Sequence, residues 1–282
     1  MHLTATFRRK RADVAQLVEQ LIRNQQVTGS NPVVGSSSMP TAIIVPTLQE
    51  VDNIMPLVEQ IEQTKVPFGE IIFVDDGSTD GTREKIRALT TAHRVRLIER
   101  DGAERGLAGA IITAANASSA DVFVAMDADL SHPPEKIPAL LHPILMNEAD
   151  LVIGSRYILG GATPGWPVWR RFLSRVASAL AYPLTGVHDS MGGFFAIRRE
   201  CLLRFANQAA GFKIVFETIA RGRALRVREV PIVFRDRARG MSKMSFAQAM
   251  RFALAWLRAI GRRITEGKAS APPLPAQRLF RD

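Results

Sequence analysis

Two stretches of the sequence decide the fold class: Thr41–Glu50 (TAIIVPTLQE) and Glu70–Thr82 (EIIFVDDGSTDGT). Each begins with a short apolar run rich in β-branched residues and continues directly into a polar cluster. A run of this kind predicts a buried strand with the polar residues at its carboxyl end. Between the two stretches, apolar residues recur at helical spacing from Ile54 to Ile61, which predicts a helix that connects two strands.

The same alternation continues along the chain. Further strands are predicted at Val95–Ile98, Asp121–Met126, Leu151–Ile153 and Arg226–Phe234, and helices at Gly81–His93, Leu107–Ala117 and Arg170–Tyr182. This order predicts an α/β fold with a mostly parallel sheet flanked by helices on both faces. Ligands bind beyond the carboxyl ends of such strands, so the clusters PTLQE, DDGSTDGT and DADLSHPP should line one crevice.

Composition places the chain among globular proteins. It has 282 residues, of which 46% are hydrophobic and 23% charged, and its one cysteine, Cys201, excludes an internal disulfide framework. No apolar run reaches the roughly 20 residues of a membrane span. The first 38 residues lack the continuous apolar core of a secretory signal. We therefore expect a cytoplasmic protein, soluble or peripheral at the inner face of the membrane.

The positive charge is concentrated near the C-terminus. Residues 221–268 hold 13 basic and 3 acidic side chains, which accounts for the whole net charge of +10. Such a segment favours an anionic partner, namely phosphates, an anionic membrane surface or nucleic acid, or else forms a solvated basic face. Within it, residues 246–265 predict a basic amphipathic helix that either lies on an anionic membrane or packs on the domain.

The first 38 residues differ from the rest of the chain. Permitted codons for residues 14–19 resemble the D-arm of a transfer RNA gene, and those for residues 29–32 resemble its T-arm. We therefore expect residues 1–38 to be a non-native or disordered extension, with translation starting at Met39. An upstream genomic sequence that cannot fold as a transfer RNA would exclude this hypothesis.

Paired carboxylates supply the candidate chemistry. Asp127 and Asp129 stand two residues apart just after a predicted buried strand, so their side chains point the same way. Hard cations such as Mg²⁺ or Mn²⁺ bind one or two carboxylates together with substrate phosphates. Asp75 and Asp76 can accept hydrogen bonds from a base or a ribose. The alternative for both pairs is a turn that caps the following helix.

The motifs taken together carry a resemblance. PTLQE, EIIFVDDGSTDGT, MDADLSHPP and GSRY resemble the inverting family 2 glycosyltransferases of the GT-A fold. The downstream segments GGATPGWPVWRRFLSR, HDSMGGFFAIRRE, GFKIVFETIAR and EVPIVFRDRARGMSK resemble one subgroup, the dolichyl- or polyprenyl-phosphate mannosyltransferases. The resemblance runs from Thr41 to Lys243. It implies a catalytic domain at residues 39–245, the amphipathic helix at 246–265 and a disordered tail at 266–282.

The resemblance implies transfer of mannose, with inversion, from GDP-mannose to a dolichyl or undecaprenyl phosphate. By their place in the motifs, the expected nucleotide contacts are Pro46, Leu48, Glu50, Val74, Asp75 and Asp76. The residues expected to bind the ribose and the diphosphate are Asp127, Ala128 and Asp129. Those expected to bind the metal, Mg²⁺ or Mn²⁺, are Asp127, Asp129 and Ser131. The expected catalytic residues are Asp129, Arg156, Arg237 and Lys243. The side chains of Arg156, Arg237 and Lys243 are expected to contact phosphates. Asp189 also matches a substrate-binding position of the family.

Two departures from the family pattern bear on the substrates. Leu48 and Gln49 stand where the family usually has tyrosine and asparagine, and Phe195 stands where it has an arginine. The first departure bears on how the base is held, and the second either removes one phosphate contact or leaves it to another residue. These changes affect the expected identity of the donor and of the acceptor more than the expected class of reaction.

The expected acceptor is a phosphate monoester with a second pKa of about 6. It is already anionic near neutral pH, so the reaction needs cations more than a base.

Alternatives remain at this point. A UDP-dependent polyprenyl-phosphate glucosyltransferase fits the same motifs, as does a non-catalytic nucleotide-sugar binding scaffold. Nucleic acid is not an expected partner, since it leaves the acidic crevice unexplained. A membrane-anchoring subunit is a further partner to consider.

Histidine and tryptophan side chains receive simpler interpretations. We expect His132 and His142 at the surface or as caps rather than as metal ligands. Trp166 and Trp169 are expected to pack within the protein rather than to contact lipid.

Overall fold

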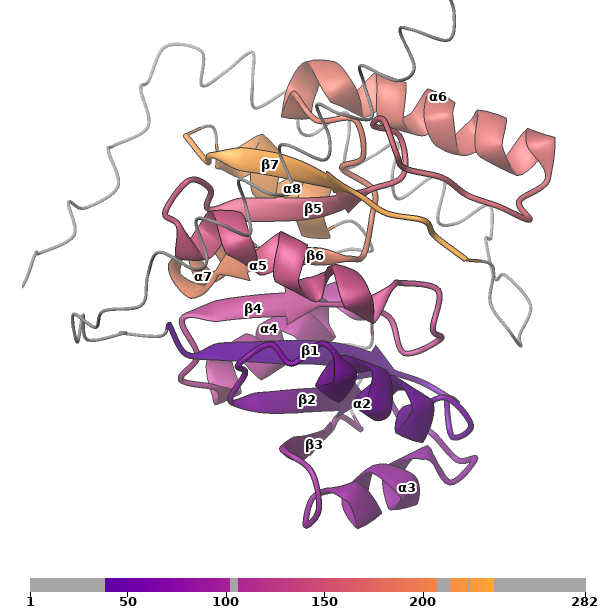
Figure 1. Ribbon diagram of the computed structural model, residues 1–282, viewed down its shortest axis with the longest axis vertical. Helices are drawn as coiled ribbons and strands as arrows, with labels where there is room; N and C mark the ends of the chain where they lie inside the picture. Colours follow the sequence, from indigo (N-terminus) through magenta and orange to yellow (C-terminus); the bar gives the residue numbers. More distant parts are fainter. Residues whose placement is uncertain (1–38, 102–105, 207–213, 223, 236–282) are drawn as a thin grey trace, which may run out of the picture. The chain divides into compact units, whose positions relative to one another are not determined.

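The computed structural model describes residues 39–101, 106–206, 214–222 and 224–235 (Figure 1). They form a seven-stranded sheet with the strand order β3-β2-β1-β4-β6-β5-β7. The strands are β1 (Thr41–Thr47), β2 (Glu70–Asp75), β3 (Val95–Glu99), β4 (Val122–Ala125), β5 (Leu151–Ser155), β6 (Phe195–Arg198) and β7 (Val227–Pro231). The extension at 1–38, the helix at 246–265, the tail at 266–282, Arg237 and Lys243 lie outside the described residues.

The sheet is mostly parallel, as predicted. β1 pairs in parallel with β2 and β4, β2 with β3, and β5 with β7. β6 is the exception, because it runs antiparallel between β4 and β5. β6 was not among the predicted strands, since three apolar residues followed by Arg198 have too little periodicity to separate a strand from a buried loop.

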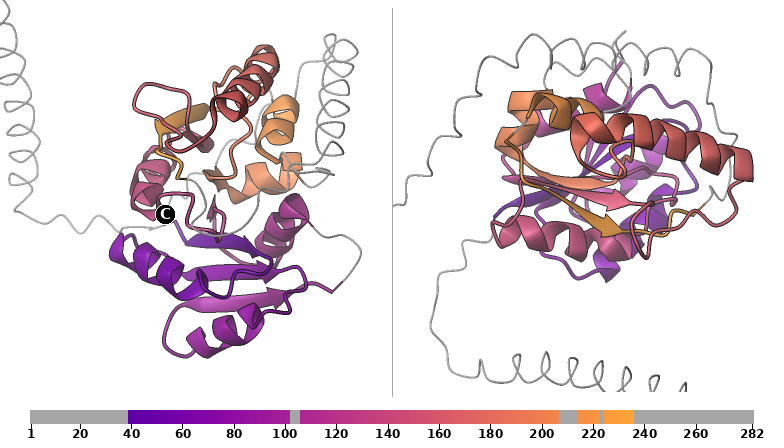
Figure 2. Two further views of the ribbon diagram at one scale, coloured as in Figure 1. Left: turned by 90° about the vertical axis from the view of Figure 1, so that its right-hand side faces the viewer. Right: turned by 90° about the horizontal axis from the view of Figure 1, so that it is seen from above.

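Helices cover both faces of the sheet, which also confirms the prediction (Figure 2). Ile43 and Val45 of β1 face one core, while Ala42 and Ile44 face the other. The first core is covered by α2 (Ile54–Gln63), α3 (Thr82–Leu89) and α5 (Ile137–Leu145). The second is covered by α4 (Leu107–Ala117), α7 (Arg199–Ala206) and α8 (Ile214–Arg221). Alternate residues of one strand therefore stabilise both layers.

The longest described helix is α6 (Val168–Thr185), which lies beyond the β7 edge of the sheet, next to α8 (Figures 1 and 2). It begins after Pro167 and ends at Gly186, which takes a left-handed conformation with φ of 69°. Glycine adopts this conformation without a steric cost, which makes it a common terminator of helices. The helices predicted before β2, β3 and β4 and at α6 are confirmed, whereas α5, α7 and α8 were not predicted.

Candidate functional site

The carboxyl ends of the parallel strands bring the first two polar clusters together. The backbone N–H of Gln49 donates to Ser78 Oγ at 2.9 Å, and that of Glu50 donates to Thr82 Oγ1 at 2.9 Å. Because β1 lies between β2 and β4, the DADLSHPP cluster follows the strand on the other side of β1. Pro46 and Glu50 are half-buried here, and Leu48 is 49% exposed.

Asp75 braces the turn after β2. Its carboxylate is fully buried and accepts hydrogen bonds from the backbone N–H groups of Gly77 (3.1 Å) and Ser78 (2.9 Å) and from Arg83 Nε (2.5 Å). Burial by itself would raise the pKa of Asp75, but the bonds from Ser78 and Arg83 hold this pKa below its usual value. Asp75 therefore stabilises the turn through hydrogen bonds to its backbone.

Asp76 is held by a residue that the sequence did not reveal. Arg100 binds both of its oxygens, through Nε (2.7 Å) and Nη2 (3.0 Å), and the backbone N–H of Gly106 donates to Oδ2 at 2.8 Å. The side chain of Val74 points into the core and is fully buried. The Asp76 side chain is 11% exposed, whereas Val74 could contact a ligand only through its backbone.

The DxD loop, residues 127–132, follows β4. Asp129 is 4% exposed and its Oδ1 accepts the backbone N–H of Ser131 at 3.1 Å, whereas the Asp127 side chain is 34% exposed. Ser131 Oγ is buried and has no hydrogen-bond partner among the described residues. Ala128 is buried in the core, which leaves the two carboxylates, the Ser131 hydroxyl and the His132 imidazole as the polar side chains of this stretch.

These groups fit a divalent cation that completes its shell with substrate oxygens. Carboxylates and a hydroxyl are hard oxygen donors, and an orphaned buried hydroxyl is satisfied when it binds a cation. Within the described ranges there is no cluster of three His, Cys, Asp or Glu side chains that would bind a metal by itself. Such a site would depend on phosphate oxygens from a ligand, as Mg²⁺ sites commonly do.

His132 does not lie at the surface, which was one of the two places expected for it. It is 3% exposed, and its Nδ1 accepts the backbone N–H of Asp127 at 3.0 Å. Its ring stacks on Phe194 with a centroid distance of 5.2 Å. Burial lowers the pKa of His132 and outweighs the opposite effect of Asp127 and Asp129. His142, by contrast, is exposed as expected.

Arg156 forms a buried ion pair with Asp189. Its Nε and Nη2 donate to the two carboxylate oxygens at 2.8 Å each, and its backbone N–H donates to Oδ2 at 2.9 Å. Burial by itself would lower the pKa of Arg156, but Asp189 raises it above the usual value. The rings of Tyr157, Trp166 and Phe234 surround the guanidinium at 5.2 to 5.6 Å. Arg156 therefore stays charged and fixed in place.

The loop that carries Asp189 is held by Glu229 of β7, a residue without a recognisable motif. Glu229 Oε1 accepts the backbone N–H of Asp189 at 3.0 Å, and Oε2 accepts that of His188 at 2.9 Å. Because β7 is parallel to β5 and adjacent to it, Glu229 reaches the loop from the edge of the sheet. Glu229 thereby fixes the position of the Arg156 partner.

Gly161 allows the chain to fold back against Arg156. A Cβ at this position would lie 2.7 Å from Ser155 O and 2.7 Å from Arg156 C, both backbone atoms that cannot give way. Gly161→Ala is therefore expected to lower the free energy of unfolding by about 1–3 kcal/mol, measured by urea denaturation. Gly69→Ala is the control, because a Cβ there would meet its nearest atom at 3.6 Å. Equal stability of the two variants would contradict this close approach.

The departures from the family pattern have defined places. Phe195 is the first residue of β6 and is 1% exposed within the second core, so this position contributes packing and not a charge.

Trp166 is 7% exposed, which confirms that it packs within the protein. Trp169 is 62% exposed, so the expectation that it packs was wrong. The backbone N–H of Arg235 donates to Ser131 O at 3.1 Å, which brings the last described residue to the DxD loop.

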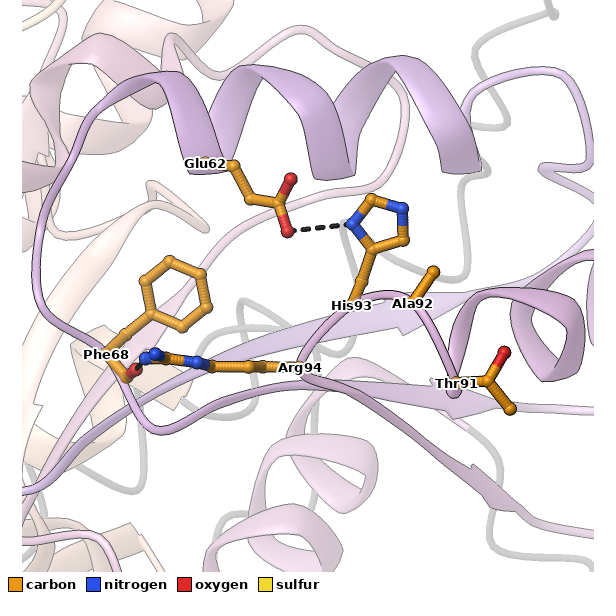
Figure 3. A pocket seen from close by; sticks show the side chains of 6 residues that line it. All are labelled: Glu62, Phe68, Thr91, Ala92, His93 and Arg94. Carbon is orange, nitrogen blue, oxygen red and sulfur yellow. Dashed lines mark hydrogen bonds and ion pairs between the residues drawn. The ribbon is translucent and has the colours of Figure 1, made fainter.

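A surface hollow elsewhere is separate from this crevice. It is lined by Glu62, Phe68, Thr91, Ala92, His93 and Arg94 (Figure 3). These residues precede β2 and β3, so the hollow lies at the amino ends of the strands, at the opposite edge of the sheet. Within it, His93 contacts Glu62 at 2.8 Å and Arg94 donates to Phe68 O at 2.7 Å. Its polar groups therefore bind one another.

The sequence is similar to those of known glycosyltransferases. The sequence profile described as Glycosyl transferase family 2 matches residues 42–205. Dolichol-phosphate mannosyltransferase of Pyrococcus furiosus is 40% identical over 73% of this chain, which spans 59% of that protein. Dolichol-phosphate mannosyltransferase of Saccharomyces cerevisiae is 37% identical over 74% of this chain and 82% of that protein. Polyprenol monophosphomannose synthase of Mycolicibacterium smegmatis is 36% identical over 78% of this chain and 87% of that protein.

Among solved structures, glucosyl-3-phosphoglycerate synthase from Mycobacterium tuberculosis, in complex with Mn²⁺, UDP-glucose and phosphoglyceric acid, has the same fold. Its TM-score is 0.65 with 21% identity, covering 83% of this chain and 86% of that one. This likeness concerns the fold alone. With strands and helices arranged as in the GT-A fold and a family profile that covers more than half of its residues, the chain belongs to glycosyl transferase family 2.

Proposed function

We propose that the protein transfers mannose from GDP-mannose to a polyprenyl phosphate, with inversion. The observation that carries this proposal is the placement of two kinds of charge at one edge of the sheet. The carboxylates of Asp127 and Asp129 follow β4, and the fixed guanidinium of Arg156 follows β5. The names of the relatives that match most of this chain supply the sugar and the class of acceptor.

On the donor side, the nucleotide lies over the turns after β1 and β2. Asp76 binds the base or the ribose, in an orientation set by Arg100. Asp127, Asp129 and Ser131 hold Mg²⁺ or Mn²⁺ together with the diphosphate. The cation, when bound, neutralises the charge that develops on the departing diphosphate. Asp75 contributes indirectly, because its carboxylate holds the turn on which Asp76 stands.

On the acceptor side, the chemistry needs cations more than a base. A phosphate monoester is largely deprotonated at neutral pH, so its oxygen already carries the negative charge of a nucleophile. Two anionic substrates must then be held close together, which Arg156, Arg237 and Lys243 achieve by contacting phosphates. Arg156 uses Nε and Nη2 for Asp189, so its Nη1 is the atom that would contact a phosphate.

The assay of this function uses the full-length chain with Mg²⁺ or Mn²⁺, undecaprenyl phosphate and radiolabelled GDP-mannose, UDP-glucose or GDP-glucose. Label in the lipid phase from GDP-mannose alone is the expected result. Label from UDP-glucose instead would replace mannose with glucose as the transferred sugar. Nucleotide binding without transfer from any donor would favour the non-catalytic scaffold.

The lipid acceptor requires a membrane, and α6 offers a surface for one. The inward side of this helix carries small buried residues, Ser178 and Ala181. Its large apolar side chains are exposed instead, with exposed fractions of 62% for Trp169, 65% for Phe172 and 51% for Leu173. This is the reverse of the usual pattern, in which the apolar face of a surface helix packs on the core.

Charge favours an anionic bilayer as the partner of this face. Arg171 and Arg175 line a shallow hollow on the helix together with Val168 and Phe172. Exposed aromatic and aliphatic side chains flanked by arginines are typical of helices that lie in the headgroup region of anionic membranes. None of the helices in the described ranges has the length and apolar character to cross a bilayer. Binding through α6 is therefore peripheral.

Co-sedimentation with vesicles tests this surface. The double variant Trp169→Ser/Phe172→Ser is expected to lower binding to phosphatidylglycerol vesicles by about tenfold or more, because two large apolar contacts are lost. Met146→Ser is the control, since Met146 is 58% exposed on the turn after α5. Wild-type chain that binds no vesicles would contradict direct membrane contact and favour a membrane-anchoring subunit.

A further inference from the structure

The backbone of the DxD loop is strained at one residue. Leu130 has φ of 61°, in the left-handed region that residues with a side chain rarely adopt. Such a conformation persists only where the surrounding contacts impose it, and it is frequent at ligand sites. The contacts that impose it here identify the residues on which the shape of the loop depends.

Three hydrogen bonds between described residues contribute to the shape of the loop. Asp129 Oδ1 accepts the N–H of Ser131 within the loop, and Ser131 O accepts the N–H of Arg235 from outside it. The third bond joins the two ends of the loop, because Nδ1 of His132 accepts the backbone N–H of Asp127 at 3.0 Å. This bond fixes Asp127, the first carboxylate residue, relative to the last residue of the loop.

The imidazole of His132 is itself fixed by the fold. Its ring stacks on Phe194 with an interplanar angle of 17° and meets the edge of Phe234 at 5.3 Å. Phe194 directly precedes β6 and Phe234 follows β7, so two separate segments determine where Nδ1 lies. On the other side, a Cβ at Gly193 would lie 3.3 Å from Asp127 Oδ1 and 3.5 Å from His132 Cε1. Gly193 therefore keeps room for both side chains.

We infer that His132 is a positioning residue that holds Asp127 and Asp129 in the conformation that receives the cation and the diphosphate. Its ring is 3% exposed, so it acts through the Asp127 backbone. Loss of the acceptor would leave the part-buried N–H of Asp127 without this partner, and the loop would shift to satisfy it. The identity of the ligand rests on the proposed function, whereas the effect on the loop does not.

Two substitutions separate the acceptor from the ring. His132→Asn places an amide oxygen near the position of Nδ1, and His132→Phe keeps an aromatic ring without an acceptor. Binding of Mn²⁺ to the full-length chain, with GDP and with UDP, is measured by electron paramagnetic resonance. His132→Phe is expected to weaken Mn²⁺ binding by about 10- to 100-fold, as loss of a residue that orients metal ligands commonly does. His132→Asn should retain most of the affinity.

The controls address folding and chemistry. His142→Phe, at an exposed histidine of α5, should bind Mn²⁺ like the wild type. Thermal unfolding compares the stability of the variants. If His132→Phe does not fold, His132→Gln replaces it, because its longer side chain carries the amide away from the position of Nδ1. Equal Mn²⁺ affinity in the wild type and the variant lacking the acceptor would overturn the inference, as would an affinity of His132→Asn as low as that of His132→Phe.

A second readout is independent of any ligand. Hydrogen exchange of the Asp127 amide, measured in the metal-free chain, should be faster in His132→Phe than in the wild type or His132→Asn. Unchanged protection would overturn the inference. Neither readout requires sugar transfer, so a wild-type chain that binds Mn²⁺ and nucleotide but transfers no mannose would contradict the proposed function alone.

Discussion

Asp129→Asn is expected to lower the rate of sugar transfer by about 10³-fold. The substitution keeps the volume of the side chain but removes the charge that would bind the divalent cation. A bound cation contributes several kcal/mol to the stabilisation of a departing diphosphate, and each 1.4 kcal/mol corresponds to a factor of ten in rate. The measurement is the initial rate of label transfer into the lipid phase at saturating GDP-mannose, over a range of Mn²⁺ concentrations.

Asp121→Asn is the matched control for that variant. Asp121 is an exposed carboxylate directly before β4, and it undergoes the same chemical change at the other end of the same strand. It should transfer sugar at the wild-type rate. Urea denaturation separates loss of chemistry from loss of folding. An Asp129→Asn variant that folds normally and retains most of the turnover would contradict the assignment of Asp129 to the cation.

Asp189→Ala is expected to lower the free energy of unfolding by about 3–5 kcal/mol. The side chain of Asp189 is fully buried and that of Arg156 is 10% exposed, so the substitution leaves a buried guanidinium without its partner. Removing one member of such a pair costs this much because the remaining charge stays desolvated. The measurement is urea denaturation at neutral pH, with the slope compared between variants.

Two further variants test the physical cause. Arg156→Met combined with Asp189→Ala removes both charges and should recover part of the lost stability, because no charge is left buried. Glu148→Ala breaks the exposed pair with Arg228, whose side chains are 49% and 56% exposed, and should change stability by only about 0–1 kcal/mol. A loss below about 1 kcal/mol for Asp189→Ala would show that the pair does not stabilise the fold.

Where the local sequence pattern was strong, the predicted elements were confirmed. The runs at β1 and β2 are apolar, β-branched and followed by turn residues, and the observed strands start at the predicted residues. β6 has only four residues, and the last of them is Arg198. It is a strand because β4 and β5 lie on either side of it, which the chain itself does not reveal.

The exposure of α6 shows the limit of periodicity. The repeat of apolar residues predicts the helix correctly, but the repeat does not tell which side faces the protein. Ser178 and Ala181 face inward because small side chains allow a close approach, and Trp169 and Phe172 remain outside. A sequence pattern reports amphipathicity, whereas the neighbouring surface decides which face is covered.

The sequence by itself determined the class of fold and the position of the carboxylates. Strand, polar cluster and helix follow one another within about ten residues, so local propensity and periodicity are enough to place Asp76, Asp127 and Asp129 at the carboxyl ends of strands. These properties depend on neighbours along the chain. They are therefore readable before any tertiary contact is known.

Only the tertiary structure decided which charges meet and which residues orient them. Arg156 and Asp189 are 33 residues apart, and Asp76 and Arg100 are 24 apart, so each pair forms only after the sheet has brought its strands together. Burial then makes the partner obligatory, because a desolvated charge or N–H without a partner is costly. His132, which the sequence placed at the surface or at a cap, is buried and accepts the backbone N–H of Asp127.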